Sequence, residues 1–241
     1  MKRLLEGIPC TSLYENLKTG PMKRLYKYYT PQAISLAGGL PMESCFPTKS
    51  MKVTLDTNEE FKLTVGDNLW LNYQRGDGTP MLKTWINNHV TALHAKGDNE
   101  SAVATCMTIG STDALLKILQ MIKTDVILFD EFAYGTAVAV AATMDKKAVG
   151  IPMDGEGLRA DALREQILLL REKGLNANLL YLVPTGQNPT GQSISDSRKM
   201  EILKVCQELN VVIVEDGKYL MNIVVVTIVC LLLCLYIICR I

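Results

Sequence analysis

The sequence has 241 residues, 21% of them charged, and its 25 basic and 25 acidic side chains cancel. A chain of this length can bury a sizeable core, and the cancelled charge leaves no electrostatic footprint for nucleic acid. The seven cysteines form no Cys-x-x-Cys pair, which favours free thiols in a reducing compartment over a disulfide framework or a metal site.

The chain begins with an irregular stretch. Up to residue 30, basic residues, tyrosines and prolines mix without clean periodicity, which predicts a short helix and an arm. A strand-like piece over residues 34–37 runs into the pair Gly38-Gly39, which breaks it. Glycines and a proline mark a loop over residues 76–80, and apolar residues at helical spacing follow over residues 81–86.

From residue 104 onwards, the pattern predicts alternating strands and helices. The predicted strands cover residues 104–109, 126–129, 179–183 and 211–214. The predicted helices cover residues 112–123, 161–173 and 196–209. Strands separated by helices of this length favour an α/β fold, with a mostly parallel sheet covered by helices on both faces. Ligands bind beyond the carboxyl ends of the strands in such sheets, so we expect the site there.

Residues 220–239 differ in composition from the rest of the chain. They are 20 residues without a charge, and a helix of that length spans roughly 30 Å, the thickness of a bilayer's hydrocarbon core. The segment is therefore a candidate C-terminal transmembrane helix that would insert the tail into a membrane. The alternative is translated sequence foreign to the rest of the protein, such as an intron or a shifted frame.

Two elements of the alternating region suit an anionic, flat ligand. Gly110, Ser111 and Thr112 follow a predicted strand and open an amphipathic helix, where unpaired backbone N–H groups can hold a phosphate. Ordinary capping of the helix by Ser111 or Thr112 would explain the same residues. Tyr134 lies just past the next strand, where its ring can stack on a heterocycle or simply pack.

Two further elements follow later strands. Two prolines and two glycines over residues 183–191 make a rigid loop that holds Asn188 in one orientation, although an Asn-Pro turn before a helix is the simpler explanation. Asp216 ends a buried strand, where a carboxylate needs a cationic or donor partner such as a pyridinium nitrogen. Tyr219 is three residues further on, so a turn can bring both side chains to the same ring.

These motifs together resemble a known family. Asn188-Pro189-Thr190-Gly191, followed 25 residues later by Asp216-x-x-Tyr219, resembles the class I/II (fold type I) aminotransferases, which depend on pyridoxal 5'-phosphate (PLP). Residues 35–41, Ser-Leu-Ala-Gly-Gly-Leu-Pro, and residues 71–74, Leu-Asn-Tyr-Gln, are similar to the aromatic and 2-aminoadipate (kynurenine-type) subgroup. The resemblance runs from residue 8 to residue 220. It implies an N-terminal arm over residues 1–33, a partial large domain over 34–219 and an apolar tail over 220–241.

The resemblance also implies a role for each candidate residue in cofactor binding. The cofactor-binding residues would be Gly110, Ser111 and Thr112 at the phosphate, Tyr134 stacked on the pyridine ring, Asn188 and Tyr219 at the ring's 3-oxygen, and Asp216 at the ring nitrogen. PLP chemistry delocalises a carbanion into a protonated ring, and a carboxylate at that nitrogen keeps it protonated.

The substrate side of the site would draw on both ends of the chain and on a second subunit. The resemblance implies that Gly39 and Asn188 lie beside the substrate, and that Tyr73 contacts the substrate and the phosphate of the neighbouring subunit in a homodimer. The implied substrates are an amino acid, aromatic or 2-aminoadipate-like, and a 2-oxo acid. The implied location is cytoplasmic, unless residues 220–239 place the chain in a membrane.

The sequence departs from the family pattern after Tyr219. The Ser-x-Ser-Lys segment that would supply the Schiff-base lysine, and the later arginine that binds the substrate carboxylate, do not occur, and Lys218 falls inside the aspartate motif. That lysine is both the covalent anchor and the general base of the reaction. We therefore expect no catalytic residue here and an inactive chain; the alternatives are a non-catalytic, membrane-anchored fragment and a gene-model artefact.

Overall fold

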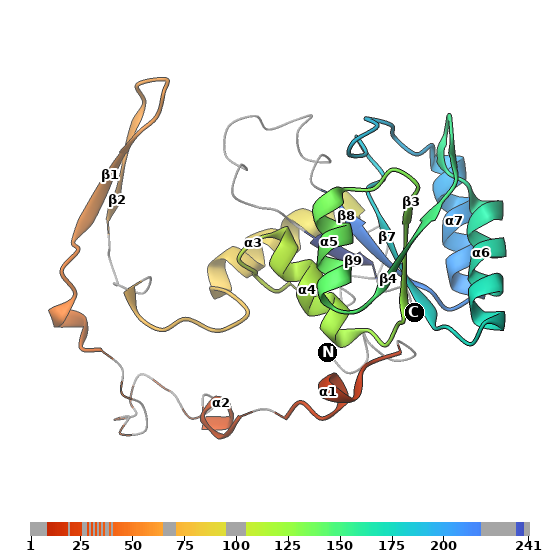
Figure 1. Ribbon diagram of the computed structural model, residues 1–241. Coiled ribbons are helices and arrows are strands. Elements are labelled where there is room, and N and C mark those ends of the chain that lie inside the picture. Colours follow the sequence, from red (N-terminus) through yellow and green to blue (C-terminus); the bar gives the residue numbers. More distant parts are fainter. Residues whose placement is uncertain are drawn as a thin grey trace. The chain divides into compact units, whose positions relative to one another are not determined.

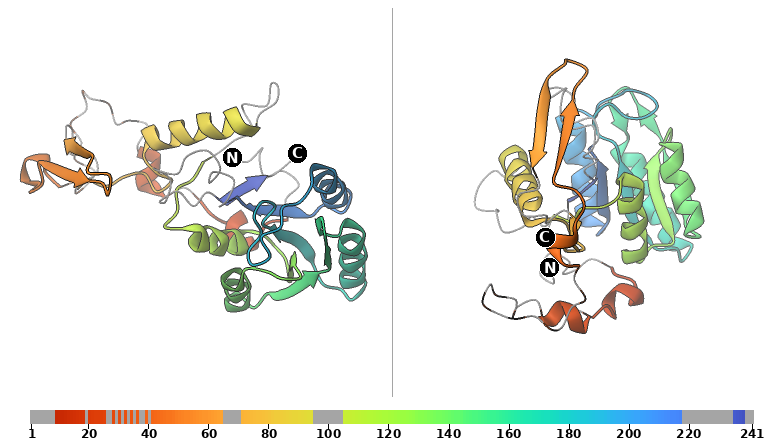
Figure 2. Two further views of the ribbon diagram at one scale, coloured as in Figure 1. Left: turned by 90° about the horizontal axis from the view of Figure 1, so that it is seen from above. Right: turned by 90° about the vertical axis from the view of Figure 1, so that its left-hand side faces the viewer.

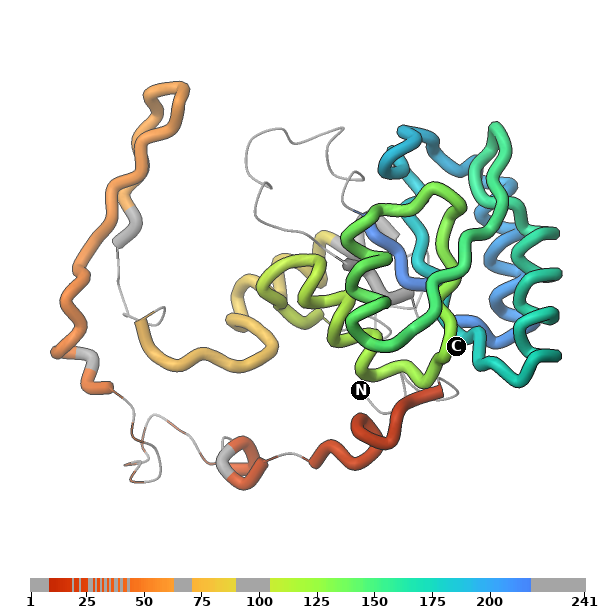
Figure 3. Tube along the Cα trace, in the orientation of Figure 1, coloured from red at the N-terminus to blue at the C-terminus, as the bar shows by residue number. Residues whose placement is uncertain are grey.

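The computed structural model describes residues 9–18, 20–25, 28, 30, 32, 34, 36, 39, 41–64, 71–94, 105–217 and 235–238. The chain forms two compact units. One unit combines residues 1–17 with residues 108–241, and the other consists of residues 18–107. The course of the chain through each unit can be followed in Figure 1 and Figure 3.

The described part of the unit of residues 18–107 contains helices and a β-hairpin. Its helices are α2 (Pro21–Leu25), the 3₁₀ turn η3 (Glu43–Cys45) and α3 (Pro80–His94). Strands β1 (Ser50–Thr54) and β2 (Glu60–Thr64) pair antiparallel; this hairpin was not predicted. Helix α3 begins at a proline, whose fixed backbone angle suits the first helical position, and extends eight residues beyond the predicted range. The strand expected over residues 34–37 is wrong at the described positions 34 and 36, which have no regular structure.

The larger unit is built on a five-stranded sheet with the order β4-β3-β7-β8-β9. The first four strands in this order are parallel to one another, and the last, β9, pairs antiparallel with β8. The strands are β3 (Val126–Asp130), β4 (Lys147–Ile151), β7 (Ala177–Leu182), β8 (Val212–Asp216) and β9 (Leu235–Ile238). A small ribbon of β5 (Met153–Asp154) and β6 (Gly157–Leu158) forms a separate sheet. The parallel α/β architecture predicted from the sequence is therefore confirmed.

Helices cover both faces of this sheet (Figure 1, Figure 2). The helices are α4 (Ser111–Met121) and α5 (Gly135–Thr143) on one face and α6 (Ala160–Glu172) and α7 (Asp196–Glu208) on the other. The short α1 (Ser12–Glu15) joins the same unit through hydrogen bonds from Thr11 to the end of α4. Ser195 caps α7 by accepting the N–H of Arg198.

Side chains of each central strand alternate between two cores. In β7, Leu180 and Leu182 belong to the core under α6 and α7, while Leu179 and Tyr181 belong to the core under α4 and α5. This alternation follows from the two-residue period of a strand. Both faces are buried, which explains why residues 179–182 of β7 form an apolar run instead of an alternating pattern.

The structure corrects several predicted boundaries and adds two elements. The strand expected over residues 104–109 is absent over the described residues 105–109. Helix α5 and strand β4 were not predicted. Helix α5 carries no charged residue, so its apolar side chains show no amphipathic period, and β4 begins with the exposed Lys147.

The apolar tail is described only in part. Within the described ranges, no helix is both long and apolar enough to cross a membrane. Residues 220–234 and 239 of the expected transmembrane helix lie outside the described residues. Residues 235–238 form strand β9, with Leu235 opposite Asp216, so the helical prediction is wrong for these four residues. Their isoleucines and tyrosine are types enriched in strands.

Candidate active site

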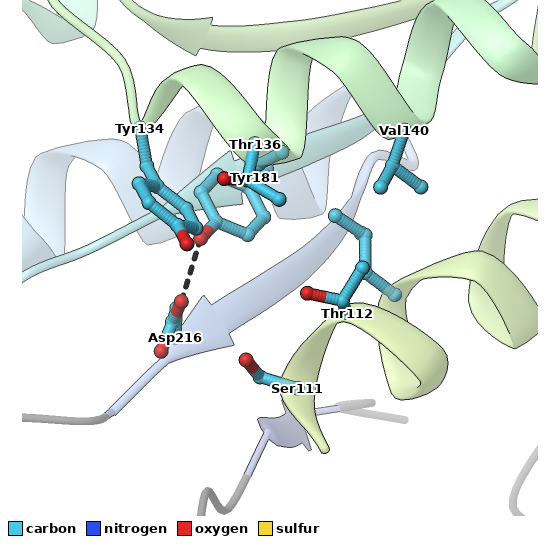
Figure 4. A pocket seen from close by; sticks show the side chains of 9 residues that line it. Ser111, Thr112, Tyr134, Thr136, Val140, Tyr181 and Asp216 are labelled. Atoms are coloured by element: carbon cyan, nitrogen blue, oxygen red, sulfur yellow. Dashed lines mark hydrogen bonds between the residues drawn. The ribbon is translucent and has the colours of Figure 1, made fainter. Parts of the chain in front are cut away.

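A pocket lies at the carboxyl end of the sheet, where ligands were expected (Figure 4). Its polar lining consists of Ser111 and Thr112 of α4, Tyr134 and Thr136 at the start of α5, Tyr181 of β7 and Asp216 of β8. The pocket holds about 210 Å³ of empty space, part of it open to solvent. Four residues predicted from separate motifs, Ser111, Thr112, Tyr134 and Asp216, thus lie around one pocket.

The start of α4 supplies donors for an anion. Gly110 is the cap residue, and no side chain forms a capping hydrogen bond there. The alternative of ordinary capping by Ser111 or Thr112 is therefore wrong, because both lie inside the first turn of the helix. Gly110 has φ 122°, a conformation that other residues rarely adopt, while an added Cβ would meet no atom within 4 Å. Backbone conformation, and not crowding, explains the glycine.

An acidic residue lies close to this anion-binding turn. Asp113 forms an i,i+4 salt bridge with Lys117 and accepts the backbone N–H of Ile109 at 3.3 Å. The hydrogen bond from Lys117 and that from Ile109 lower the pKa of Asp113, with Lys117 the larger cause. The carboxylate is thus charged, but a cation partly compensates it.

Asp216 accepts a hydrogen bond from a tyrosine that was not predicted as a site residue. The hydroxyl of Tyr181 donates a hydrogen bond to Oδ2 of Asp216 at 2.6 Å, and only 2% and 9% of these residues' surfaces are exposed. Burial, followed by the charge of Asp216, raises the pKa of Tyr181, so this hydroxyl stays protonated and acts as a donor. A tyrosine within the leucine run of residues 179–182 was the signal in the sequence, since a buried tyrosine hydroxyl needs a partner.

Tyr134 provides an aromatic surface in the same pocket. It precedes α5 and occupies the cap position without making a side-chain cap. Figure 4 shows its ring close to that of Tyr181, with both hydroxyl groups toward Asp216. The phenol rings and the carboxylate therefore lie on one side of the pocket, across from the start of α4.

A second polar cluster joins the loop after β7 to the loop after β3. Gln187, in the loop after β7, donates through Nε2 to the carbonyl of Phe132 and, at 3.4 Å, to Oδ2 of Asp130. Its Oε1 accepts the N–H and the hydroxyl of Thr190, at 2.9 and 2.7 Å. Gln187 is 3% exposed. It connects the loop that contains Asn188 with the loop that leads to Tyr134, and it was not predicted as a site residue.

The remaining predicted residues are not brought to the pocket by the described structure. Asn188 is half-buried in its loop and is not among the residues that line the pocket. Tyr219 lies outside the described residues. Gly39 and Tyr73 belong to the other unit, and Tyr73 is 78% exposed. The roles of these four residues, like those of the residues that line the pocket, stay predictions.

The residues around the pocket fit a phosphorylated pyridine. The uncapped turn of α4 suits the phosphate, the ring of Tyr134 suits the heterocycle, and the buried carboxylate of Asp216 suits a protonated ring nitrogen. These groups come from three different elements, and each has a partner on the same small ligand.

Known proteins resemble this chain over much of its length. The family model described as aminotransferase class I and II matches residues 47–220. Kynurenine/alpha-aminoadipate aminotransferase of Bos taurus is 28% identical, over 77% of this chain and 47% of the relative. Aromatic-amino-acid aminotransferase 1 of Thermococcus litoralis is also 28% identical, over 90% and 54%. The chain thus spans about half the length of the curated relatives it matches.

Solved structures agree with the fold. An aminotransferase of Candida albicans superimposes with a TM-score of 0.71, at 24% identity, over 86% of this chain and 48% of that protein. The alpha-aminoadipate aminotransferase LysN of Thermus thermophilus, solved with N-(5'-phosphopyridoxyl)-L-leucine, gives a TM-score of 0.52 at 25% identity, over 63% of this chain and 36% of that protein. With a family match over more than half of its length, the chain belongs to the class I and II aminotransferases, a family of PLP-dependent transferases.

Proposed function

We propose that the pocket between α4, α5 and β8 binds PLP, and that the associated activity is transamination between an amino acid and a 2-oxo acid. The observation that carries this proposal is the convergence of Ser111, Thr112, Tyr134 and Asp216 on one pocket. Bound PLP supplies an electron sink for the carbanion formed from the amino acid. The names of the relatives from Bos taurus and Thermococcus litoralis support an aromatic, kynurenine or 2-aminoadipate-like amino donor.

Asp216 has the central electrostatic role in this proposal. Its carboxylate, 9% exposed, would hold a proton on the ring nitrogen through a charge-assisted hydrogen bond. Such a bond is stronger in a site that excludes water. Tyr134 would orient the ring by contact with its face, and the N–H groups at the start of α4 would bind the phosphate.

The covalent part of the reaction needs a Schiff-base lysine, and none occurs after the aspartate motif in this sequence. No Ser-x-Ser-Lys segment follows Asp216, and a Schiff-base lysine serves as both nucleophile and general base. We therefore propose that the 241-residue chain by itself binds the cofactor without covalent attachment and does not transaminate. Asn188 and Tyr219 at the ring's 3-oxygen, Gly39 beside the substrate and Tyr73 at a partner subunit's phosphate belong to the same proposal, as do a homodimer and a cytoplasmic location.

The alternative function is a non-catalytic fragment anchored in a membrane. It rests on the composition of residues 220–239 alone. Residues 235–238, the part of that segment that the structure describes, form strand β9 and not a helix. Fusing residues 220–239 behind a soluble reporter separates the two ideas. Retention in the membrane pellet after alkaline carbonate washing would favour the anchor, and release into the supernatant would remove it.

Pyridoxamine 5'-phosphate (PMP) is a suitable probe for the proposed site because it binds without a Schiff base. We expect the purified chain to bind PMP saturably, as measured by the fluorescence of the cofactor. The Asp216→Asn variant should bind PMP about tenfold or more weakly than the parent. Asp56→Asn, an exposed carboxylate in the β1–β2 turn, is the matched control and should bind as the parent does. Absence of saturable binding by the parent chain would contradict the proposal.

A further inference from the structure

The contact between Tyr181 and Asp216 follows from strand register. β7 and β8 are parallel neighbours, with Tyr181 opposite Val214. Asp216 is two residues beyond Val214 and therefore faces the same side of the sheet, the side covered by α4 and α5. A long side chain reaches such a diagonal neighbour, and the 2.6 Å hydrogen bond shows that it does.

The position of the tyrosine ring is determined by packing. Tyr181 is 2% exposed and belongs to the core formed with α4 and α5. Its ring lies 5.4 Å from that of Phe129 on the neighbouring strand β3. Because the ring is packed, the position of the hydroxyl is restricted. Figure 4 shows this hydroxyl pointing toward Asp216.

We infer that Tyr181 is a positioning residue, whose hydroxyl fixes the carboxylate of Asp216 for the ring nitrogen of the cofactor. This inference rests on the proposed function, since it concerns the same site. A carboxylate has about four lone-pair positions, so donation from Tyr181 restrains the carboxylate and leaves it able to accept a second donor. Without this bond, the side chain of Asp216 has one restraint fewer, and a well-aligned bond to the ring nitrogen then costs more conformational entropy.

The inference predicts a loss that depends on the ring nitrogen. Tyr181→Phe keeps the packed ring and removes only the hydroxyl. We expect the affinity for PMP to fall about tenfold, the scale of one hydrogen bond to a charged group. The affinity for the 1-deaza analogue of PMP, in which carbon replaces the ring nitrogen, should change less than about twofold, because that ligand has no nitrogen for Asp216 to hold. A merely structural role would weaken both ligands alike.

The experiment is a fluorescence titration of the 241-residue chain with PMP and with its 1-deaza analogue. The parent is compared with Tyr181→Phe, Asp216→Asn, the double variant, and the control Tyr14→Phe on α1, which does not line the pocket. A selective loss for PMP in Tyr181→Phe supports the inference. Equal losses for both ligands, or no loss for either, would overturn it. No saturable PMP binding by the parent is a different result, and it overturns the proposed function together with this inference.

Tyr181→Phe leaves the buried carboxylate of Asp216 without this donor, and the variant could therefore fail to fold. In that case the double variant still tests the inference. Asp216→Asn and the double variant both lack that charge. If Tyr181 acts through Asp216, removing its hydroxyl in the Asp216→Asn background should change PMP affinity by less than about twofold. A further loss of tenfold would show that Tyr181 acts on the ligand directly, and would overturn the positioning role.

Discussion

Replacing Asp130 by asparagine should stabilise the protein at neutral and alkaline pH. Asp130 ends β3, is 3% exposed, and its Oδ1 has no hydrogen-bond partner among the described residues. Burial raises the pKa of this carboxyl from 3.8 to about 6, against the opposing effect of hydrogen bonds from Gln187 and from the backbone of Val183. The folded chain therefore has an incompletely compensated buried charge whenever Asp130 is ionised.

The sign and size of the effect follow from linkage. The folded state binds the proton more tightly than the unfolded state, so the stabilising contribution of protonated Asp130 is complete below pH 3.8 and is lost as the pH rises through about 6. The whole shift corresponds to about 3 kcal/mol. Asparagine has nearly the same shape and no charge. Asp130→Asn should therefore raise the free energy of unfolding by up to about 3 kcal/mol at about pH 8, and by little at about pH 4.

Urea unfolding at a series of pH values measures this difference. Far-UV circular dichroism is the appropriate signal, because both tryptophans, Trp70 and Trp85, lie in the unit of residues 18–107. The control is Asp56→Asn, in an exposed turn, for which the pH profile of stability should match the parent. The reasoning would be refuted if the free energy of unfolding of the parent and of Asp130→Asn changed in parallel with pH. It would also be refuted if the variant were less stable than the parent at about pH 8.

Three further outcomes are expected. Gln187→Leu removes the acceptor for the N–H and hydroxyl of Thr190, so the urea midpoint should fall by the equivalent of about 1–3 kcal/mol. An unchanged midpoint would mean that these hydrogen bonds do not stabilise the fold. The 241-residue chain, mixed with PLP, an aromatic amino acid and 2-oxoglutarate, should form no glutamate above a heat-treated control once contaminating transaminases are excluded. In a longer version that carries the Schiff-base lysine, Asp216→Ala should lower kcat by about 10²-fold or more with a smaller effect on substrate affinity; a kcat within about threefold of the parent would show that Asp216 is assigned wrongly.

Local patterns were sufficient for much of the site. Ser111, Thr112, Tyr134 and Asp216 all line the pocket. Tyr134 and Asp216 were predictable because they follow or end the parallel strands β3 and β8, and residues at the carboxyl ends of such strands meet at one edge of the sheet. Ser111 and Thr112 were predictable as the start of an amphipathic helix, although the strand expected before them is absent over residues 105–109. The parallel arrangement itself was predictable from the alternation of apolar strands with amphipathic helices.

Elements without a local signal required the tertiary structure. Helix α5 has no charged residue to give an amphipathic period, and its helical state depends on packing against α4 and the sheet. The hydrogen bonds from Gln187 to Asp130 and from Tyr181 to Asp216 join residues 57 and 35 positions apart. No spacing rule relates such residues, because only the strand order and register bring them together.

The sequence by itself determined the family, the α/β class and the types of residue available at the strand ends, because those depend on composition and short-range spacing. Only the tertiary structure decided which face of the sheet each of these residues occupies. Tyr181 and Leu180 are neighbours in an apolar strand, yet one enters the pocket and the other the opposite core. The physical reason is that a strand's two-residue period defines two faces, and the helices packed on each face decide which becomes the site.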